Sequence, residues 1–132
     1  MYERHETGIN GEDYATNYLK DIGYKIHCRN FRSNFGEIDI VAIDNEELVF
    51  VEVKTRTQKL FGQPADAVNV NKKHHIYKTA EYFLLINGLE NAYIRFDVIE
   101  IFISQNNEIK LSHIKNAILE KPTYTNVENF NI

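Results

Sequence analysis

Two neighbouring β-rich segments, residues 37–43 and 48–56, constrain the fold of this chain more than any other feature. Both are rich in β-branched residues, and only a short polar run separates them, so the sequence predicts an antiparallel hairpin. The second segment begins with apolar residues on both faces, as strands do when helices cover both sides of a sheet. We therefore expect a sheet whose central strands are buried.

Helical periodicity lies on both sides of this hairpin. Apolar residues recur at three- and four-residue steps over residues 7–22 and 69–87, and Gly23 and Gly88 are the expected helix ends. Either Thr7 or Asn10 is expected to cap the first helix. Three further strands are expected at residues 25–31, 93–104 and 108–113. A loop is expected at residues 60–64.

These elements predict an α/β domain with a central mixed β-sheet flanked by helices, in the order α-β-β-β-α-β. We expect a single domain over residues 1–114 and a loosely ordered C-terminal tail over residues 115–132. The sequence contains no apolar run near the roughly 18 residues of a membrane span, and its polar start is not a signal peptide. A soluble, cytoplasmic protein that does not enter a membrane is therefore expected, and its one cysteine, Cys28, cannot form an internal disulfide.

Strand alternation brings several charged side chains together on the hairpin. Glu52, Lys54 and Arg56 share one face of their strand with Phe50. On the neighbouring strand Glu37, Asp39 and Val41 lie together, with Ile38, Ile40 and Ala42 on the opposite face, and Val41 is expected to face Phe50. A turn centred in the polar run places Asp39 opposite Glu52 and Glu37 opposite Lys54. Two opposed carboxylates repel, and a cation such as Mg²⁺ would relieve that repulsion because it prefers carboxylate oxygens. The alternative is that Glu52 only forms a salt bridge with Lys54 or Arg56.

Positive charge surrounds this acidic centre, although the formal net charge is -4. Residues 54–78 contain six Lys or Arg but a single acid, and Lys25, Arg29 and Arg32 lie just upstream. The net charge argues against a nucleic-acid coat protein but not against a nuclease, and solvated surface charge remains the alternative for the basic residues. His74 and His75 do not predict a zinc site, because adjacent helical side chains diverge by about 100° and the sequence offers no Cys/His partner set.

The order of these residues resembles a known family. Asp39 followed by Glu52, Val53 and Lys54 resembles the D…(D/E)xK signature of the PD-(D/E)xK nuclease superfamily. The flanking sequence is more specific than this signature: RNFR at residues 29–32, GEIDIVA at 36–42, VFVEVKTR at 49–56 and RFDV at 95–98. Over residues 7–101 the chain resembles the bacterial YraN-like family of predicted endonucleases, which is related in pattern to archaeal Holliday junction resolvases.

The resemblance implies a restriction-endonuclease-like core and Mg²⁺- or Mn²⁺-dependent hydrolysis of DNA, with branched or structured DNA in repair or recombination as the expected substrate. It implies that Asp39, Glu52, the Val53 carbonyl and Glu12 bind the metal. It also implies that Lys54 orients the attacking water or offsets charge on the phosphate, with Glu37 supporting Lys54. An acid such as Glu12 is also favoured in the first turn of a helix by the helix dipole alone.

The residues expected to contact DNA phosphates are Arg29, Asn30, Arg32, Arg56 and Lys72. A homodimer is expected only by analogy with junction resolvases. Asp97 is interpreted as a buried structural contact that supports the sheet. Two other hypotheses remain: an inactive nucleic-acid-binding module of the same fold, and a protein-interaction subunit whose carboxylates only form ion pairs.

Overall fold

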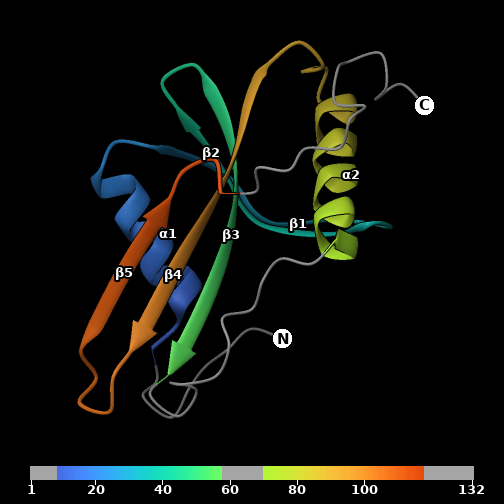
Figure 1. Cartoon of the computed structure of the whole chain (residues 1–132). Helices are drawn as coiled ribbons and strands as arrows, with labels where there is room; N and C mark the ends of the chain where they lie inside the picture. Colours follow the sequence, from blue (N-terminus) through green and yellow to red (C-terminus); the bar gives the residue numbers. More distant parts are fainter. Residues whose placement is uncertain (1–8, 58–69, 118–132) are drawn as a thin grey trace.

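A mixed five-stranded sheet with a helix packed against each face forms the described part of the protein (Figure 1). The computed structural model describes residues 9–57 and 70–117. The elements are α1 (Gly11–Asp21), β1 (Lys25–Ser33), β2 (Gly36–Asp44), β3 (Glu47–Thr57), α2 (Val70–Ile86), β4 (Tyr93–Ile103) and β5 (Ile109–Ile114). The predicted α/β class and element order are confirmed, with the last expected strand present as β5. The expected loop at residues 60–64 and nearly all of the expected tail lie outside the described residues.

The five strands lie in the order β1-β2-β3-β4-β5. Tight turns join β1 to β2, β2 to β3 and β4 to β5, and each of these pairs is antiparallel. β3 and β4 are parallel, and α2 lies between them in the chain, because parallel neighbours need a crossover connection. No helix within residues 9–57 and 70–117 is long and apolar enough to cross a membrane.

Local sequence explains both ends of α1. The Asn10 side chain accepts hydrogen bonds from the backbone N–H groups of Glu12 and Asp13 at 2.9 and 3.1 Å, so Asn10 caps the helix. The alternative cap, Thr7, lies outside the described residues. Gly23 has a φ of +101°, a conformation that glycine adopts without a side-chain clash, and the chain turns there into β1.

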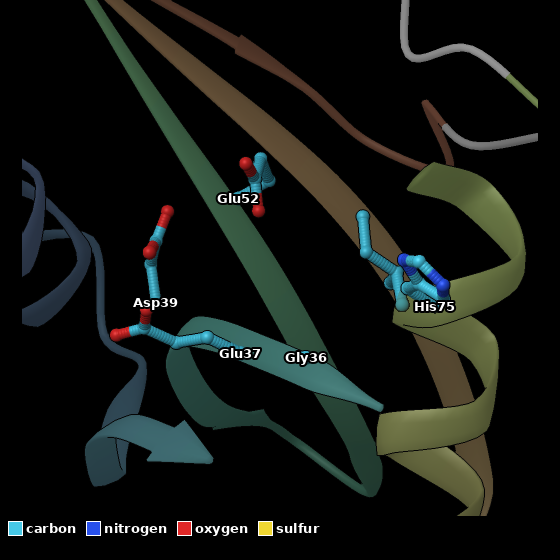
Figure 2. A pocket seen from close by; sticks show the side chains of 6 residues that line it. Gly36, Glu37, Asp39, Glu52 and His75 are labelled. Atoms are coloured by element: carbon cyan, nitrogen blue, oxygen red, sulfur yellow. The ribbon is translucent and has the colours of Figure 1, made fainter. Parts of the chain in front are cut away.

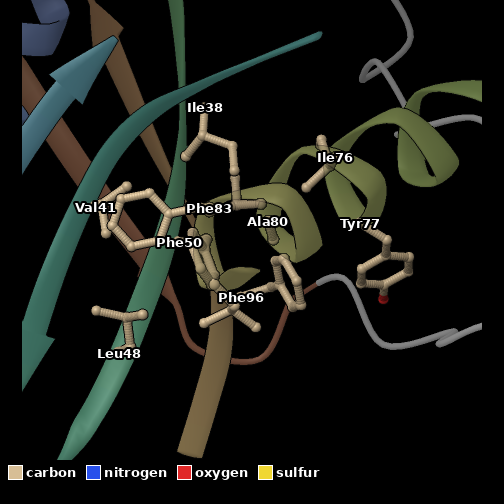
Figure 3. Close-up of a cluster of buried hydrophobic side chains, with 11 residues drawn as sticks. Ile38, Val41, Leu48, Phe50, Ile76, Tyr77, Ala80, Phe83 and Phe96 are labelled. Carbon is tan, nitrogen blue, oxygen red and sulfur yellow. The ribbon is translucent and has the colours of Figure 1, made fainter. Parts of the chain in front are cut away.

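Alternation along β3 divides the core into two clusters. Phe50 faces α2, where the centroid of its ring lies 5.7 Å from that of Phe83 (Figure 3). The ring centroid of Phe96 on the neighbouring β4 lies 5.4 Å from that of Phe50. Val49 and Val51 face α1 and pack with Leu19. The predicted alternation of β3 is therefore confirmed, and it directs Glu52 and Lys54 toward the α2 side.

The predicted register between β2 and β3 is also confirmed, since Val41 pairs with Phe50 and Ile40 with Val51. The prediction for Ile38 is wrong. Ile38 was expected on the face of Ile40, but it packs with Val41 in the α2 cluster (Figure 3). Beyond Ile40, β2 is paired with β1 alone, and the alternation of faces along β2 breaks between Ile38 and Ile40.

Candidate functional site

Asp39 lies where the pairing between β2 and β3 stops. Its Oδ2 accepts a hydrogen bond from the backbone N–H of Val53 at 2.8 Å, so the side chain takes the place of a strand partner. The carboxylate is thereby fixed beside Glu52, the residue that precedes Val53. The N–H and C=O of one strand residue point to the same edge, so the Val53 carbonyl points to the Asp39 side of β3.

A pocket of about 250 Å³ opens next to these carboxylates. Its lining consists of Gly36, Glu37, Asp39, Glu52, His75 and Ile76. Figure 2 shows the three carboxylates on the β2 and β3 side of the pocket and His75 reaching from α2 on the other side. The structure thus brings Asp39, Glu52 and Glu37 to one hollow. The predicted strand pairs Asp39–Glu52 and Glu37–Lys54 are not part of the β2–β3 ladder, which ends at Ile40 and Val51, and Glu37 pairs with Arg32 of β1 instead.

The charged form of Asp39 is destabilised in this pocket. Burial raises the pKa of Asp39, and the negative charge of Glu52 raises it further, to about 7. The Val53 N–H opposes this shift, and the charges of Glu12 and Glu37 add to it. A partly buried carboxyl with such a pKa indicates an excess of negative charge that a cation would neutralise.

The acidic donors at this site are carboxylate oxygens, which suits Mg²⁺ or Mn²⁺. Within the described ranges, no three His, Cys, Asp or Glu side chains lie close enough together to form a ready-made metal cluster. A small divalent cation commonly binds through one or two carboxylates and several waters. The residues present therefore fit such an ion as a water-rich site.

Glu12 approaches the site from the first turn of α1. Its carboxylate lies 3.6 Å from the Arg29 Nε. Burial raises the pKa of Glu12, although Arg29 opposes the shift. With its amide nitrogen turned toward the acids, Asn30 donates to Glu12 at 3.3 Å and to Glu37 at 3.0 Å. These contacts link Glu12 to Glu37.

The basic residues predicted to contact DNA differ in their surroundings. Arg29 also pairs with Asp13 at 2.8 Å, so it serves partly to hold α1 against β1. Arg32 is 75% exposed and lies 3.5 Å from Glu37, at the rim of the pocket. Arg56 is half-buried on β3, and the side chain of Lys72 lies outside the described residues. Their contacts with DNA stay a prediction.

Glu37 makes its ion pair with Arg32. The expected pairing of Glu37 with Lys54 is absent from the ion pairs that the structure describes for residues 9–57 and 70–117. Lys54 is half-buried on β3, two residues after Glu52 and on the same face. Its ammonium is therefore directed to the side of the strand that carries the site.

His75 was not expected at this site from the sequence. It lines the pocket because the β1–β2 turn packs closely against α2 at this point. A Cβ at Gly36 would lie 3.5 Å from the His75 Cβ and from the Thr79 Oγ1. That contact joins residues far apart in the chain, and a periodic helix pattern does not report it.

Comparison with known proteins shows one family. Residues 11–101 match the model of the uncharacterised protein family UPF0102. A UPF0102 protein of Caldicellulosiruptor saccharolyticus is 43% identical over 115 residues, which cover 86% of this chain and 98% of that protein. A UPF0102 protein of Clostridium botulinum is 43% identical over 118 residues, covering 88% and 96%. One of Caldicellulosiruptor bescii is 46% identical over 114 residues, covering 85% and 96%.

Proposed function

This chain belongs to the uncharacterised protein family UPF0102, and we propose that it is a divalent-metal-dependent endonuclease that hydrolyses phosphodiester bonds in DNA. One observation carries the proposal. The carboxylates of Asp39 and Glu52 share a pocket in which the pKa of Asp39 is raised, and Lys54 lies on the same face of β3 as Glu52. The resemblance of this arrangement to the PD-(D/E)xK signature supports the same reaction and a place in DNA repair or recombination.

Asp39 and Glu52 would hold Mg²⁺ or Mn²⁺, with the Val53 carbonyl and Glu12 as further ligands, Glu12 directly or through water. A bound divalent cation offsets the charge that develops on the phosphate and lowers the pKa of a bound water. The Val53 N–H keeps one oxygen of Asp39 in place, which fixes the direction of the other oxygen. The protein thus supplies a fixed pair of carboxylates at an opening between two strands.

Lys54 contributes a positive charge on the same face of β3. Its ammonium is a compact donor that would contact a phosphate oxygen or the attacking water. Arg32 lies at the pocket rim on the β1–β2 hairpin and is well exposed. Phosphate contacts of this kind position a nucleic acid without reading its sequence, so the pocket is suited to recognising DNA by shape.

A second candidate is a nucleic-acid-binding module that does not cleave. The observation in its favour is that no three potential ligands in the described part of the chain are already gathered around one point. The raised pKa of Asp39 favours the nuclease, because a module without a metal gains nothing from two carboxylates in one pocket. A third reading, a protein-interaction subunit, predicts that Mg²⁺ does not stabilise the fold.

The test is cleavage of labelled duplex, single-stranded, flap and four-way-junction DNA with Mg²⁺, Mn²⁺ or EDTA. We expect metal-dependent cutting by the wild type, and its loss in Asp39→Ala, Glu52→Gln and Lys54→Ala with the fold retained. Glu46→Gln and Lys25→Ala are matched controls, because they remove the same charges at exposed positions away from the pocket. Cutting that survives in Glu52→Gln and Lys54→Ala would contradict the proposed site.

Thermal unfolding with increasing Mg²⁺ or Mn²⁺ separates the three candidates. A cation that binds only the folded protein must raise the melting temperature. DNA binding without metal-dependent stabilisation and without cutting would identify the non-cleaving module. Equal melting curves with metal and with EDTA, together with no DNA binding, would leave only the ion-pair reading.

A further inference from the structure

An exposed aromatic residue lies at the edge of the pocket. Phe35 occupies the two-residue turn between β1 and β2 and is 43% exposed. The next residue, Gly36, lines the pocket, and consecutive Cα atoms are only about 3.8 Å apart. Short turns normally carry polar or glycine residues, so neither the turn geometry nor the core accounts for a phenylalanine here.

The structure holds this turn in a fixed position. The Phe35 N–H donates to the Ser33 Oγ at 2.9 Å, and that hydroxyl lies 3.2 Å from the Thr79 Oγ1 on α2. Thr79 is fully buried and donates in turn to the His75 carbonyl at 2.8 Å. The exposed ring is therefore presented from a turn that is tied to the same helix that lines the pocket.

Positive charge accompanies the ring. The Lys78 Nζ lies 5.7 Å from the centre of the Phe35 ring and 3.6 Å from Glu81, and the exposed Arg32 is three residues away from Phe35 on the same hairpin. Tyr82, one turn beyond Lys78 on α2, adds a second aromatic side chain that is 40% exposed. An exposed aromatic ring with basic side chains nearby is complementary to a nucleobase flanked by phosphates.

We propose that Phe35 is a stacking platform for an unpaired base in the DNA strand whose phosphate enters the carboxylate pocket. The inference rests on the proposed function and extends it to a substrate class. Bases inside a continuous duplex are stacked on both faces, so a base reaches Phe35 only where the strand is single, frayed or branched. DNA with an unpaired nucleotide next to the cut is therefore the preferred substrate.

The test is a binding cycle at constant salt, because salt alone changes the affinity of such complexes. Ca²⁺, which also takes oxygen ligands, replaces Mg²⁺ so that binding is measured without cleavage. Samples with EDTA serve as the reference for checking that the DNA stays intact. The ligand is a labelled single-stranded oligonucleotide, either complete or with one abasic position moved stepwise along it. The proteins are the wild type, Phe35→Ala and Phe35→Tyr.

We expect Phe35→Ala to lower the affinity by about 5- to 100-fold, the range of base–aromatic stacking. Removing the base at one position of the oligonucleotide should lower the wild-type affinity similarly. The variant and the abasic position together should lower the affinity little more than either change alone. Phe35→Tyr should retain the wild-type affinity. Tyr93→Ala is the matched control, because Tyr93 is 72% exposed at the start of β4 and should not affect binding.

Wild-type affinity in Phe35→Ala, strict additivity at every abasic position, or no binding of single strands by the wild type would overturn the stacking proposal. A change of oligomeric state in Phe35→Ala by sedimentation would assign the ring to a contact between copies and would also overturn it. Thermal melting checks that each variant is folded.

Cleavage then separates this proposal from the nuclease proposal. In Mg²⁺ the wild type should cut flap or single-stranded DNA faster than duplex, and Phe35→Ala should slow the cutting of flap and single-stranded DNA more than the cutting of duplex. If the wild type cuts no DNA, the proposed endonuclease fails, whereas the binding cycle in Ca²⁺ still decides whether Phe35 stacks on a base.

Discussion

The position of Asp39 at the end of a strand ladder explains both its geometry and its charge. Asp39 accepts a hydrogen bond from the Val53 N–H, which would otherwise need a partner on a neighbouring strand. The same contact draws Asp39 next to Glu52 in a partly buried place, where burial and the like charge raise its pKa to about 7. A carboxylate arranged in this way opposes folding when it is charged and no cation is bound.

Asp39→Asn should therefore stabilise the metal-free protein at high pH. The folded carboxyl has a pKa near 7, whereas the ordinary value is 3.8, so the folded wild type gains stability by taking up a proton as the pH falls from above 7 toward 4. Asn cannot ionise, and its carbonyl can still accept from Val53. In EDTA at pH 8.5 we expect the variant to be more stable by about 1–4 kcal/mol, the upper value corresponding to the full shift from 3.8 to about 7, and the two proteins to converge as the pH approaches 4. Urea unfolding measures this, and a variant less stable than the wild type at pH 8.5 would refute it.

The first turn of α1 must approach β3 closely to bring Glu12 toward the site. Gly11 permits this approach, because a Cβ at this position would overlap the Oγ1 of Thr55 and lie 3.1 and 3.3 Å from its Cβ and Cγ2. Rotating the Thr55 side chain does not relieve the clash, since its Cβ is itself too near. The placement of Glu12 therefore depends on a contact between a glycine and a β-branched residue on different elements.

Gly11→Ala should destabilise the protein by about 1–3 kcal/mol, the usual cost of overpacking a tight contact. Adding Thr55→Ala should recover most of that loss, because it removes the atoms that the new methyl group meets. Equilibrium unfolding in urea of the two single variants and the double variant measures the effect. If Gly11→Ala is as stable as the wild type, α1 has room to move away from β3.

Local signals predicted most elements, because they depend on neighbouring residues. Asn10 and Gly23 mark the ends of α1, and alternation with a short turn was enough to pair Val41 with Phe50. The same logic failed at Ile38, which lies beyond the end of the β2–β3 ladder and pairs only with β1. His75 was not predicted as part of the pocket, because its place depends on the packing of a distant hairpin against α2.

A buried polar network connects four elements of the whole molecule. Arg95 donates to both oxygens of Asp97 at 3.0 and 3.1 Å, and it also reaches Asp44 and Glu47 at the turn between β2 and β3. His113 on β5 lies 2.8 Å from Asp97 through Nε2. The sequence predicted Asp97 as a structural contact, which is confirmed, but its partners come from segments that no local pattern relates.

Asp97→Ala should be the most destabilising of these changes, at about 3–5 kcal/mol, because it removes the acceptor of a buried ion pair. Asp97 is fully buried and Arg95 is only 7% exposed. Burial alone would raise the pKa of Asp97, but hydrogen bonds from His113 and Arg95 lower it below its ordinary value. Folding thus favours the charged carboxylate.

The control is Asp13→Ala, which removes an equally short ion pair with Arg29 at an exposed site and should cost about 1 kcal/mol or less. Urea unfolding at pH 7 compares the two. Equal costs would mean that the buried network contributes no more to stability than a surface pair, and that strand pairing and apolar packing hold β4 and β5 in the sheet without it.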